Sequence, residues 1–315
     1  MIGSPNALFR LAAPALVALA VGSGCSGTVT SSSNTNTSST MALLSVERSA
    51  PASDVVSAPR SHASAYFLRL QAGADDVLAA RLVGASLTLP AVDRCESIDA
   101  LWNQGLPLAS LAPVELVDVG EVSLEAEETS ETMAARAFPD VIDLVSGVVY
   151  TTRDQIAASL PDEGRYVFRI SGSAAFPRVT LGANAPGPPD EVTIGETPLG
   201  SAPIVLERRD VALRWRAGGG ASVIYVDLVS NEDGAVDRVR CTFADVGRAI
   251  LPSTALPRSA TQIIAIHRVL RETPETRGWD GEQLQGEAGS RGLDAGEIRF
   301  DLAVTGGLRF ETAAP

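Results

Sequence analysis

The sequence contains no lysine, so all 25 of its basic side chains are arginines, and its 315 residues include only two histidines and three cysteines. The missing lysine excludes phosphate-binding loops that end in Gly-Lys, together with mechanisms that use a lysine amine. The few histidines and cysteines leave little material for metal sites built from imidazole and thiolate. We therefore expect neither a metal site nor a cofactor.

Basic side chains are also outnumbered, because 38 acidic residues give the chain a formal net charge of −13. Proteins that bind DNA or RNA use a basic surface to neutralise phosphates, so nucleic acid is not an expected partner. What the chain does have is a hydrophobic content of 45%, which is typical of a globular protein with a real core. Its length corresponds to about two domains.

Residues 1–24 have the pattern of a secretory signal peptide. Arg10 supplies positive charge before an apolar stretch, Leu11–Val21, that consists largely of alanine, leucine and valine. A membrane-spanning helix needs about 17 to 25 apolar residues, and this stretch is shorter. The pattern therefore predicts a processed signal and not a transmembrane anchor.

Five residues at the end of this stretch, Val21-Gly22-Ser23-Gly24-Cys25, resemble the lipobox of bacterial lipoproteins. The resemblance implies that Cys25 becomes the acylated N-terminus, carries fatty acyl chains such as palmitate, and holds the protein in the lipid bilayer of the cell envelope. Ser26 after the cysteine is compatible with sorting to the outer membrane. The alternative is an ordinary signal peptide in which Cys25 has no role.

The segment after Cys25 is rich in small polar residues. Residues 26–40 are almost entirely Ser, Thr, Asn and Gly, and the stretch up to Arg60 remains rich in Ser, Ala and Pro. Such a composition buries too little apolar surface to offset the entropy of ordering. We expect residues 25–62 to form a flexible tether.

From Ala63 onward the sequence predicts strands, because apolar residues alternate or occur in short runs between Gly, Pro, Asn and Asp. Helical patterns are few, at Asp93–Trp102 and Thr152–Leu160. A hairpin is predicted around Asn231-Glu232-Asp233-Gly234. The predicted strands are Tyr66–Leu70, Val148–Thr152, Tyr166–Ile170, Ala202–Leu206, Val211–Arg216, Val223–Val229, Val236–Phe243, Ile263–Leu270 and Ile298–Val304.

The fold class that follows is mainly β, with two antiparallel sandwich-like domains. Residues 182–189 hold five Gly or Pro and predict a linker between a β-rich domain at 63–181 and a second domain at 190–315. The second half has about seven strand patterns, with Trp215 on an early one. In these respects it resembles an immunoglobulin or fibronectin type III sandwich.

Cys95 and Cys241 remain once Cys25 is assigned to the lipid anchor. In an extracytoplasmic compartment the two can form a disulfide that closes a long loop. The alternative is a pair of buried free thiols that pack as small hydrophobic residues. The sequence leaves both open.

Patterns for catalysis are scarce. The chain has no Gly-x-Ser-x-Gly pentad. His62 falls at the end of the predicted tether, and His267 shares a strand face with Ile263, Ala265 and Val269, where a packed histidine is expected. We expect a protein that is not an enzyme; the alternative is an envelope hydrolase that uses two carboxylates in an interdomain cleft. The acidic run at 121–131 is interpreted as a solvated edge strand or loop.

Trp279 is the candidate binding residue, because it lies in a Gly-rich acidic loop instead of a strand pattern. An indole on a loop of a rigid scaffold is suited to recognition. The alternative is that Trp279 folds back as a plug over the end of the sandwich. The chain is thus expected to bind, or to support, an envelope protein or polysaccharide.

Overall fold

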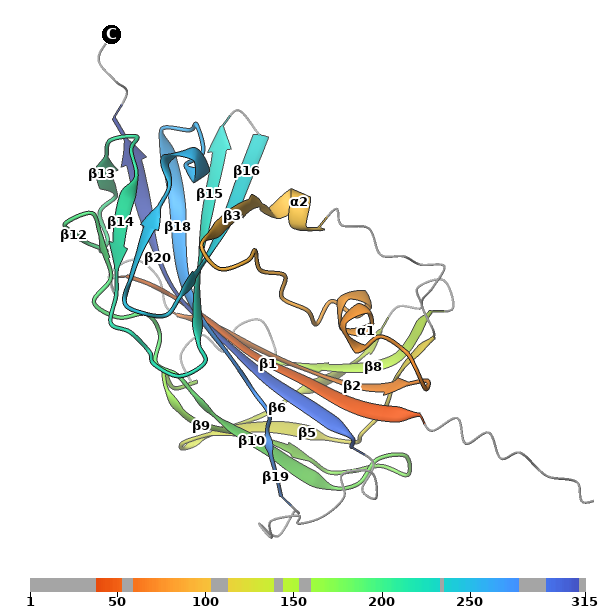
Figure 1. Ribbon diagram of the computed structural model, residues 1–315. Coiled ribbons are helices and arrows are strands. Elements are labelled where there is room, and N and C mark those ends of the chain that lie inside the picture. The colour runs from red at the N-terminus through yellow and green to blue at the C-terminus, as the bar shows by residue number, and fades with distance from the viewer. Residues whose placement is uncertain are drawn as a thin grey trace, which may run out of the picture. The chain divides into compact units, whose positions relative to one another are not determined.

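The computed structural model describes residues 38–52, 59–102, 113–138, 144–152, 160–232, 235–277 and 293–311. All of these lie within one compact unit that spans Asn36–Pro315. The unit is mainly β, which confirms the predicted fold class (Figure 1).

The largest sheet of the described residues has eleven strands. They are β1 (Ser39–Pro51), β2 (Arg60–Leu70), β3 (Arg94–Ser97), β4 (Val114–Leu116), β7 (Ala134–Phe138), β8 (Val145–Thr151), β13 (Ile204–Leu206), β15 (Val223–Glu232), β16 (Ala235–Ala244), β18 (Thr261–Glu272) and β20 (Ala295–Phe310). Their order is β3-β16-β15-β18-β20-β1-β2-β4-β8-β7, and β13 pairs with the end of β20. We call this the long sheet.

Two smaller sheets and short helices complete the described structure. One small sheet, in the order β19-β10-β9-β5-β6, consists of β5 (Val122–Ala126), β6 (Thr129–Thr132), β9 (Gly164–Ile170), β10 (Val179–Ala185) and β19 (Glu275–Arg277). The other, in the order β12-β11-β14-β17, consists of β11 (Thr193–Ile194), β12 (Thr197–Pro198), β14 (Val211–Arg214) and β17 (Arg248–Leu251). The helices are α1 (Asp76–Leu82), α2 (Ile98–Trp102) and the 3-10 helix η2 (Ser253–Ala255).

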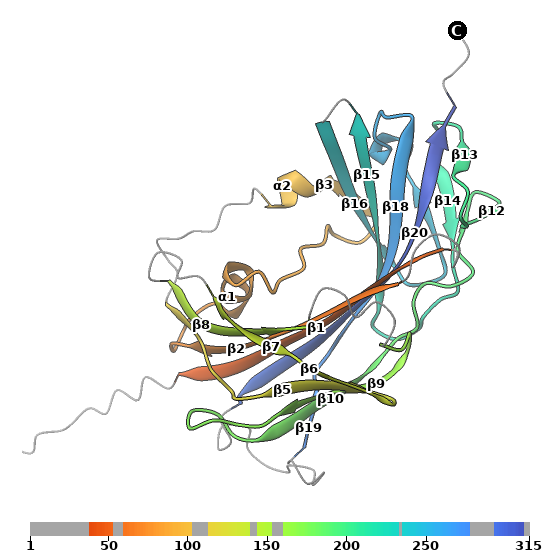
Figure 2. The same cartoon turned by 180° about the vertical axis from the view of Figure 1, so that it is seen from behind.

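The long sheet is mixed. Most neighbours are antiparallel, as in the β15–β16 hairpin, which the sequence predicts. β1 and β20 instead run parallel, from Met41 opposite Ala295 to Pro51 opposite Thr305. The first and the last described strands therefore lie side by side in the middle of the sheet, and Figure 2 shows the two crossing the molecule together.

One face of the long sheet, which we call the sandwich face, is apolar. Near β1 and β2 it packs on the five-stranded sheet, in a core that includes Leu44, Phe67 and Phe168. Near β15 and β18 it packs on the four-stranded sheet, where Val226 and Ile266 belong to the second core. Two sandwich-like cores thus share one long sheet (Figure 1).

The opposite face, which we call the strap face, has a different cover. At the β2 end, α1 packs through Ala79 against an apolar cluster with Leu68 and Leu116. Asp75 caps the N-terminus of α1, and its side chain accepts a hydrogen bond from the Leu78 amide at 3.1 Å. The irregular segment at residues 85–90, which we call the strap, connects α1 to β3 (Figure 1).

The predicted tether at 25–62 is too long. Residues 25–37 lie outside the described residues, but β1 and the start of β2 occupy much of the rest. Ala42, Leu44 and Val46 alternate with more polar residues, and all three are buried. This period-two pattern selects a strand although Ser, Ala and Pro dominate the composition.

The predicted boundary at 182–189 does not separate domains. β10 runs through Gly182 to Ala185, and strands from both predicted halves pair within the long sheet. A Cβ at Gly182 would lie 2.9 Å from the Arg165 guanidinium, so this glycine permits a close approach inside a sheet. Its presence marks tight packing, not a linker.

The remaining expectations for secondary structure hold in most places. All nine predicted strands coincide with observed strands, with shifted ends. The helix predicted at Asp93–Trp102 is shorter, because its first part pairs as β3 and only Ile98–Trp102 is helical. Residues 153–159 of the other predicted helix lie outside the described residues. The acidic run forms the β5–β6 hairpin, and β6 is an edge strand as expected.

Candidate functional site

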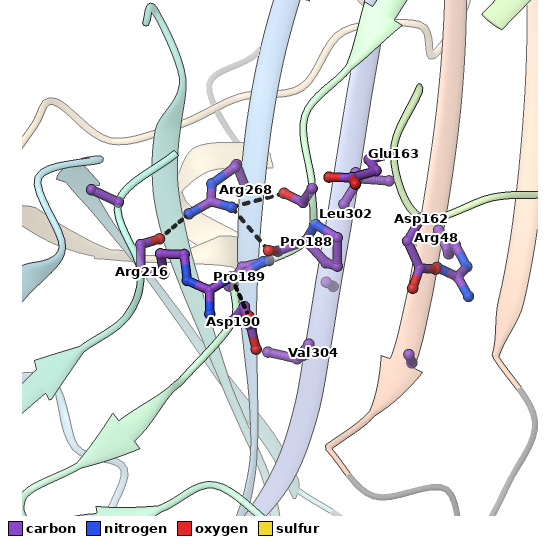
Figure 3. A pocket seen from close by; sticks show the side chains of 14 residues that line it. Arg48, Asp162, Glu163, Pro188, Pro189, Asp190, Arg216, Arg268, Leu302 and Val304 are labelled. Atoms are coloured by element: carbon purple, nitrogen blue, oxygen red, sulfur yellow. Dashed lines mark hydrogen bonds and ion pairs between the residues drawn. The ribbon is translucent and has the colours of Figure 1, made fainter. Parts of the chain in front are cut away.

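A cleft opens on the sandwich face between the two cores. Its volume is about 620 Å³, and it is lined by residues of β1, β18 and β20, by residues 187–190 and by Asp162 and Glu163. Figure 3 shows the Arg48–Asp162 pair on one side of the cleft and Arg216 with Asp190 on the other. Three arginines and three carboxylates lie on its walls.

One wall of the cleft is fixed by a buried ion pair. Arg268 belongs to β18 and points to the sandwich face, where its side chain is 4% exposed and that of Asp245 is 2% exposed. Arg268 Nε donates to Asp245 Oδ2 at 2.7 Å. Asp245 also accepts from Trp215 Nε1 and Ser222 Oγ, each at 2.7 Å. Three side chains therefore converge on one carboxylate.

The protonation of this carboxylate follows from its surroundings. Burial alone would raise the pKa of Asp245, but hydrogen bonds from Arg268, Ser222 and Trp215 outweigh it and hold the pKa below its usual value. Gly218 permits the approach, since a Cβ there would lie 2.5 Å from Arg268 Nε and 2.6 Å from Asp245 Oδ2. The Asp245 carboxylate therefore stays charged at neutral pH.

Arg268 also holds the segment that forms the rim of the cleft. Its Nη1 donates to the carbonyls of Gly187 and Pro188 at 2.8 and 2.9 Å, and Nη2 donates to the Arg216 carbonyl at 2.5 Å (Figure 3). These donors are used within the protein. Arg268 is therefore a positioning residue that sets the shape of the cleft.

Four of the other charged side chains on the cleft walls form ion pairs, one pair on each side. Arg216 contacts Asp190 at 2.9 Å and Glu191 at 2.5 Å. The hydrogen bond with Glu191, followed by the charge of Asp190, raises the pKa of Arg216. On the other side Arg48 forms an ion pair with Asp162. Prolines and aliphatic side chains, among them Pro188, Leu302 and Val304, lie between these pairs.

This arrangement suits recognition of a molecule with both apolar and charged groups. Its walls offer aliphatic side chains and prolines together with charged side chains, and ligand sites commonly combine apolar lining with placed polar groups. Among the residues that the structure describes, no group of three or more His, Cys, Asp or Glu side chains is placed to hold a metal ion. Among the described residues, each arginine that lines the cleft forms an ion pair with a carboxylate.

A second polar constellation lies on the strap face. His267 Nδ1 lies 2.7 Å from Asp301 Oδ1, and the Tyr225 hydroxyl donates to Asp301 Oδ2 at 2.7 Å. The rings of Tyr225 and His267 stack with centroids 4.1 Å apart. Burial and the adjacent Asp301 raise the pKa of Tyr225. His267 is thus a packed residue of a strand, as its alternation indicates.

Arginines on this face bind the strap through its backbone. Arg299 donates to the Ala85 carbonyl at 2.7 Å, Arg271 to the Leu87 carbonyl at 3.0 Å and Arg240 to the Thr88 carbonyl at 3.0 Å. Because an irregular segment cannot pair its own carbonyls, donors from the sheet below must satisfy them. The strap is held by these three side chains.

Cys95 and Cys241, whose bonding the sequence leaves open, form a disulfide. Cys95 on β3 lies directly opposite Cys241 on β16, and a disulfide connects them. Cys241 is completely buried in the second core. The bond fastens the chain that follows the strap to the edge of the long sheet.

The other predicted site residues have varied positions. Cys25 and Trp279 lie outside the described residues. His62 belongs to β2, opposite Glu47 of β1, and not to a tether. Trp102, at the end of the helix predicted from the sequence, lies on α2 and is 68% exposed.

The cleft residues were missed by the sequence analysis, although one of them has a local signal. Arg268 stands between Ile266 and Leu270, on the apolar face of its strand. A charged residue at such a position indicates a buried partner. No comparable local pattern points to Arg48, Asp162 or Arg216.

Comparison with known proteins does not assign this chain to a family: no family model matches it, and no curated protein sequence matches it. In the part of the chain that the structure describes, no helix is both long and apolar enough to cross a membrane.

Proposed function

We propose that this chain is a bacterial lipoprotein of the cell envelope, anchored in a lipid bilayer by acylated Cys25 and most compatible with the outer membrane. Its head would act as a binding or structural module without catalysis. The partner would be an envelope protein or polysaccharide, and Trp279 remains a proposed contributor to its capture.

The cysteine inventory carries this proposal. The chain has three cysteines, and the disulfide uses Cys95 and Cys241. A disulfide of this kind persists in an oxidising compartment outside the cytosol. The one remaining cysteine, Cys25, is the residue that the lipobox pattern requires to be a free thiol before acylation. The bonding pattern and the lipobox therefore support the same location.

The cleft supports binding over hydrolysis. Asp162, Glu163 and Asp190 line one cavity, which is the kind of arrangement that a two-carboxylate hydrolase needs. However, Asp162 and Asp190 each form an ion pair with an arginine. Carboxylates directed at guanidinium groups favour a recognition role, and we keep hydrolysis as the alternative.

The anchor is tested by Cys25→Ser in cells that are fed an alkyne analogue of palmitate. The unaltered chain is expected to incorporate the label and to sediment with membranes, whereas Cys25→Ser loses the label. The double variant Cys95→Ser/Cys241→Ser is the matched control and keeps it. Label that persists in Cys25→Ser would refute the anchor.

The binding role is tested by photo-crosslinking in intact cells. A photoreactive residue at Ala217, on the cleft wall, should yield a defined adduct, and the same residue at Ala135 of β7 should not. Equal crosslinking patterns from both positions would argue against the cleft as the binding site.

A further inference from the structure

Two arginines face each other on the outer side of the four-stranded sheet. Arg214 of β14 is the direct cross-strand partner of Arg248 of β17, and both are exposed. Like charges placed directly opposite one another destabilise a strand pair. Backbone pairing of β14 with β17 does not depend on these two side chains, yet it brings their like charges together.

The chain supplies no counter-charge to this pair within the described residues. Most other arginines there form ion pairs, for example Arg69 with Glu115 and Arg165 with Glu275. No described carboxylate forms an ion pair with Arg214 or Arg248. In a chain with an excess of acidic residues, this leaves a local positive site open to an anion from outside.

Exposed aliphatic side chains flank the arginines. Ile250 of β17, the cross-strand partner of Ala212, is 57% exposed, and Val246, two residues before Arg248, is 65% exposed. We call Arg214, Arg248, Val246 and Ile250 the arginine–aliphatic patch. It combines two cations and one aliphatic side chain on a short strand pair with a second aliphatic side chain, Val246, in the bend before β17.

We propose that the arginine–aliphatic patch docks the head on the surface of a bilayer that contains anionic lipids. Arginine guanidinium groups pair with lipid phosphates, and aliphatic tips beside them can enter the boundary between headgroups and acyl chains. The negative charge of the rest of the head is repelled by such a surface. The patch therefore selects which side of the head approaches.

The short stretch of chain between Cys25 and β1 supports a lipid bilayer as the partner of the patch. This step rests on the proposed anchor at Cys25. β1 begins at Ser39, so Cys25 and Ser38 are 13 positions apart. A chain of that length spans at most about 45 Å. An acylated Cys25 would keep the head near the bilayer at high effective concentration, where a weak patch is sufficient.

The test uses the mature chain with Cys25→Ser, so that binding does not depend on acylation. It is floated at low ionic strength with vesicles of phosphatidylcholine alone or with about one third phosphatidylglycerol. Flotation is expected only with the anionic vesicles. Since each arginine near an anionic surface contributes about a fivefold factor, Arg214→Glu/Arg248→Glu should weaken partitioning by about thirtyfold or more.

The matched control is Arg136→Glu/Arg309→Glu, which makes the same charge change at exposed arginines on β7 and β20. It should weaken partitioning far less. A third variant, Val246→Ser/Ile250→Ser, should weaken flotation without changing charge. Near-ultraviolet circular dichroism checks that every variant stays folded.

Two outcomes overturn the proposal. One is equal loss of flotation in the patch variant and in the control, which would indicate a net-charge effect. The other is absence of flotation together with patch-dependent binding to polygalacturonate, which would assign the patch to an anionic polysaccharide. Neither outcome bears on acylation of Cys25, which the palmitate label reports separately.

Discussion

The sandwich face and the strap face belong to the same strands, yet they are held by different forces. The sandwich face meets other sheets that bring their own apolar side chains, and it carries one buried ion pair, Arg268–Asp245. The strap face meets an irregular segment that brings backbone carbonyls, and it uses arginines to satisfy them. The chemistry of a cover thus decides the chemistry of the face below it.

The largest expected effect comes from breaking the ion pair of the sandwich face. Arg268→Met leaves the Asp245 carboxylate buried among dipoles without its charge partner. It also removes the guanidinium group that donates to the carbonyls of Gly187 and Pro188. We expect a loss of about 3 to 5 kcal/mol in the free energy of unfolding. Denaturation by urea measures it.

The matched control for Arg268→Met is Arg69→Met, because Arg69 forms an ion pair with Glu115 in an exposed position of the long sheet. Arg69→Met should lower the free energy of unfolding by less than about 1 kcal/mol. Equal effects of the two substitutions would contradict the structural role given to the buried pair.

The next effect concerns the disulfide that fastens the chain after the strap. Cys95→Ala/Cys241→Ala is expected to cost about 2 to 4 kcal/mol, since the bond constrains a long loop in the unfolded chain. A dithiol reductant should lower the stability of the unaltered chain to a similar degree, and Cys25→Ser should not. A urea midpoint that reductant leaves unchanged would count against the bond.

The smallest effect is a pH dependence on the strap face. Burial alone would raise the pKa of Asp301, but hydrogen bonds from His267 and Tyr225 and the charge of Arg299 outweigh it and lower the pKa. A carboxyl whose pKa is lower in the folded chain contributes stability above the ordinary Asp value of about 3.9. That contribution disappears as the pH falls through the lower, folded-state pKa.

Asp301→Asn should therefore cost about 1 to 3 kcal/mol at neutral pH and make acid unfolding less steep. Asp245, whose pKa is also lowered, is unchanged in this variant, so part of the loss of stability in acid should persist. Asp237→Asn, at an exposed position of β16, is the control and should leave the profile unchanged. The free energy of unfolding of the unaltered chain and of both variants, measured between about pH 2 and pH 7, tests this expectation.

The strands were predictable because alternation is a local property. It identified the β15–β16 hairpin and β18, and it placed His267 on the face opposite Ile266. β1 was missed because Ser, Ala and Pro outweigh its three buried apolar residues in composition, although alternation is present.

The domain organisation and the cleft were not predictable, since both depend on which distant strands pair. Nothing local shows that β20 returns beside β1, or that Asp162 meets Arg48. The Gly- and Pro-rich stretch at 182–189 looks like a linker by composition. Its carbonyls are bound by Arg268, a contact that only the folded chain displays.

The pairing of β1 with β20 imposes an order on folding. β20 lies between β1 and β18, so the two ends of the long sheet cannot join until residues 295–310 are present. A chain exported from its N-terminus would therefore remain without its central pairing until almost all of it had crossed the membrane. If the chain is exported as proposed, this delayed closure would keep it in a form that a translocation channel can thread.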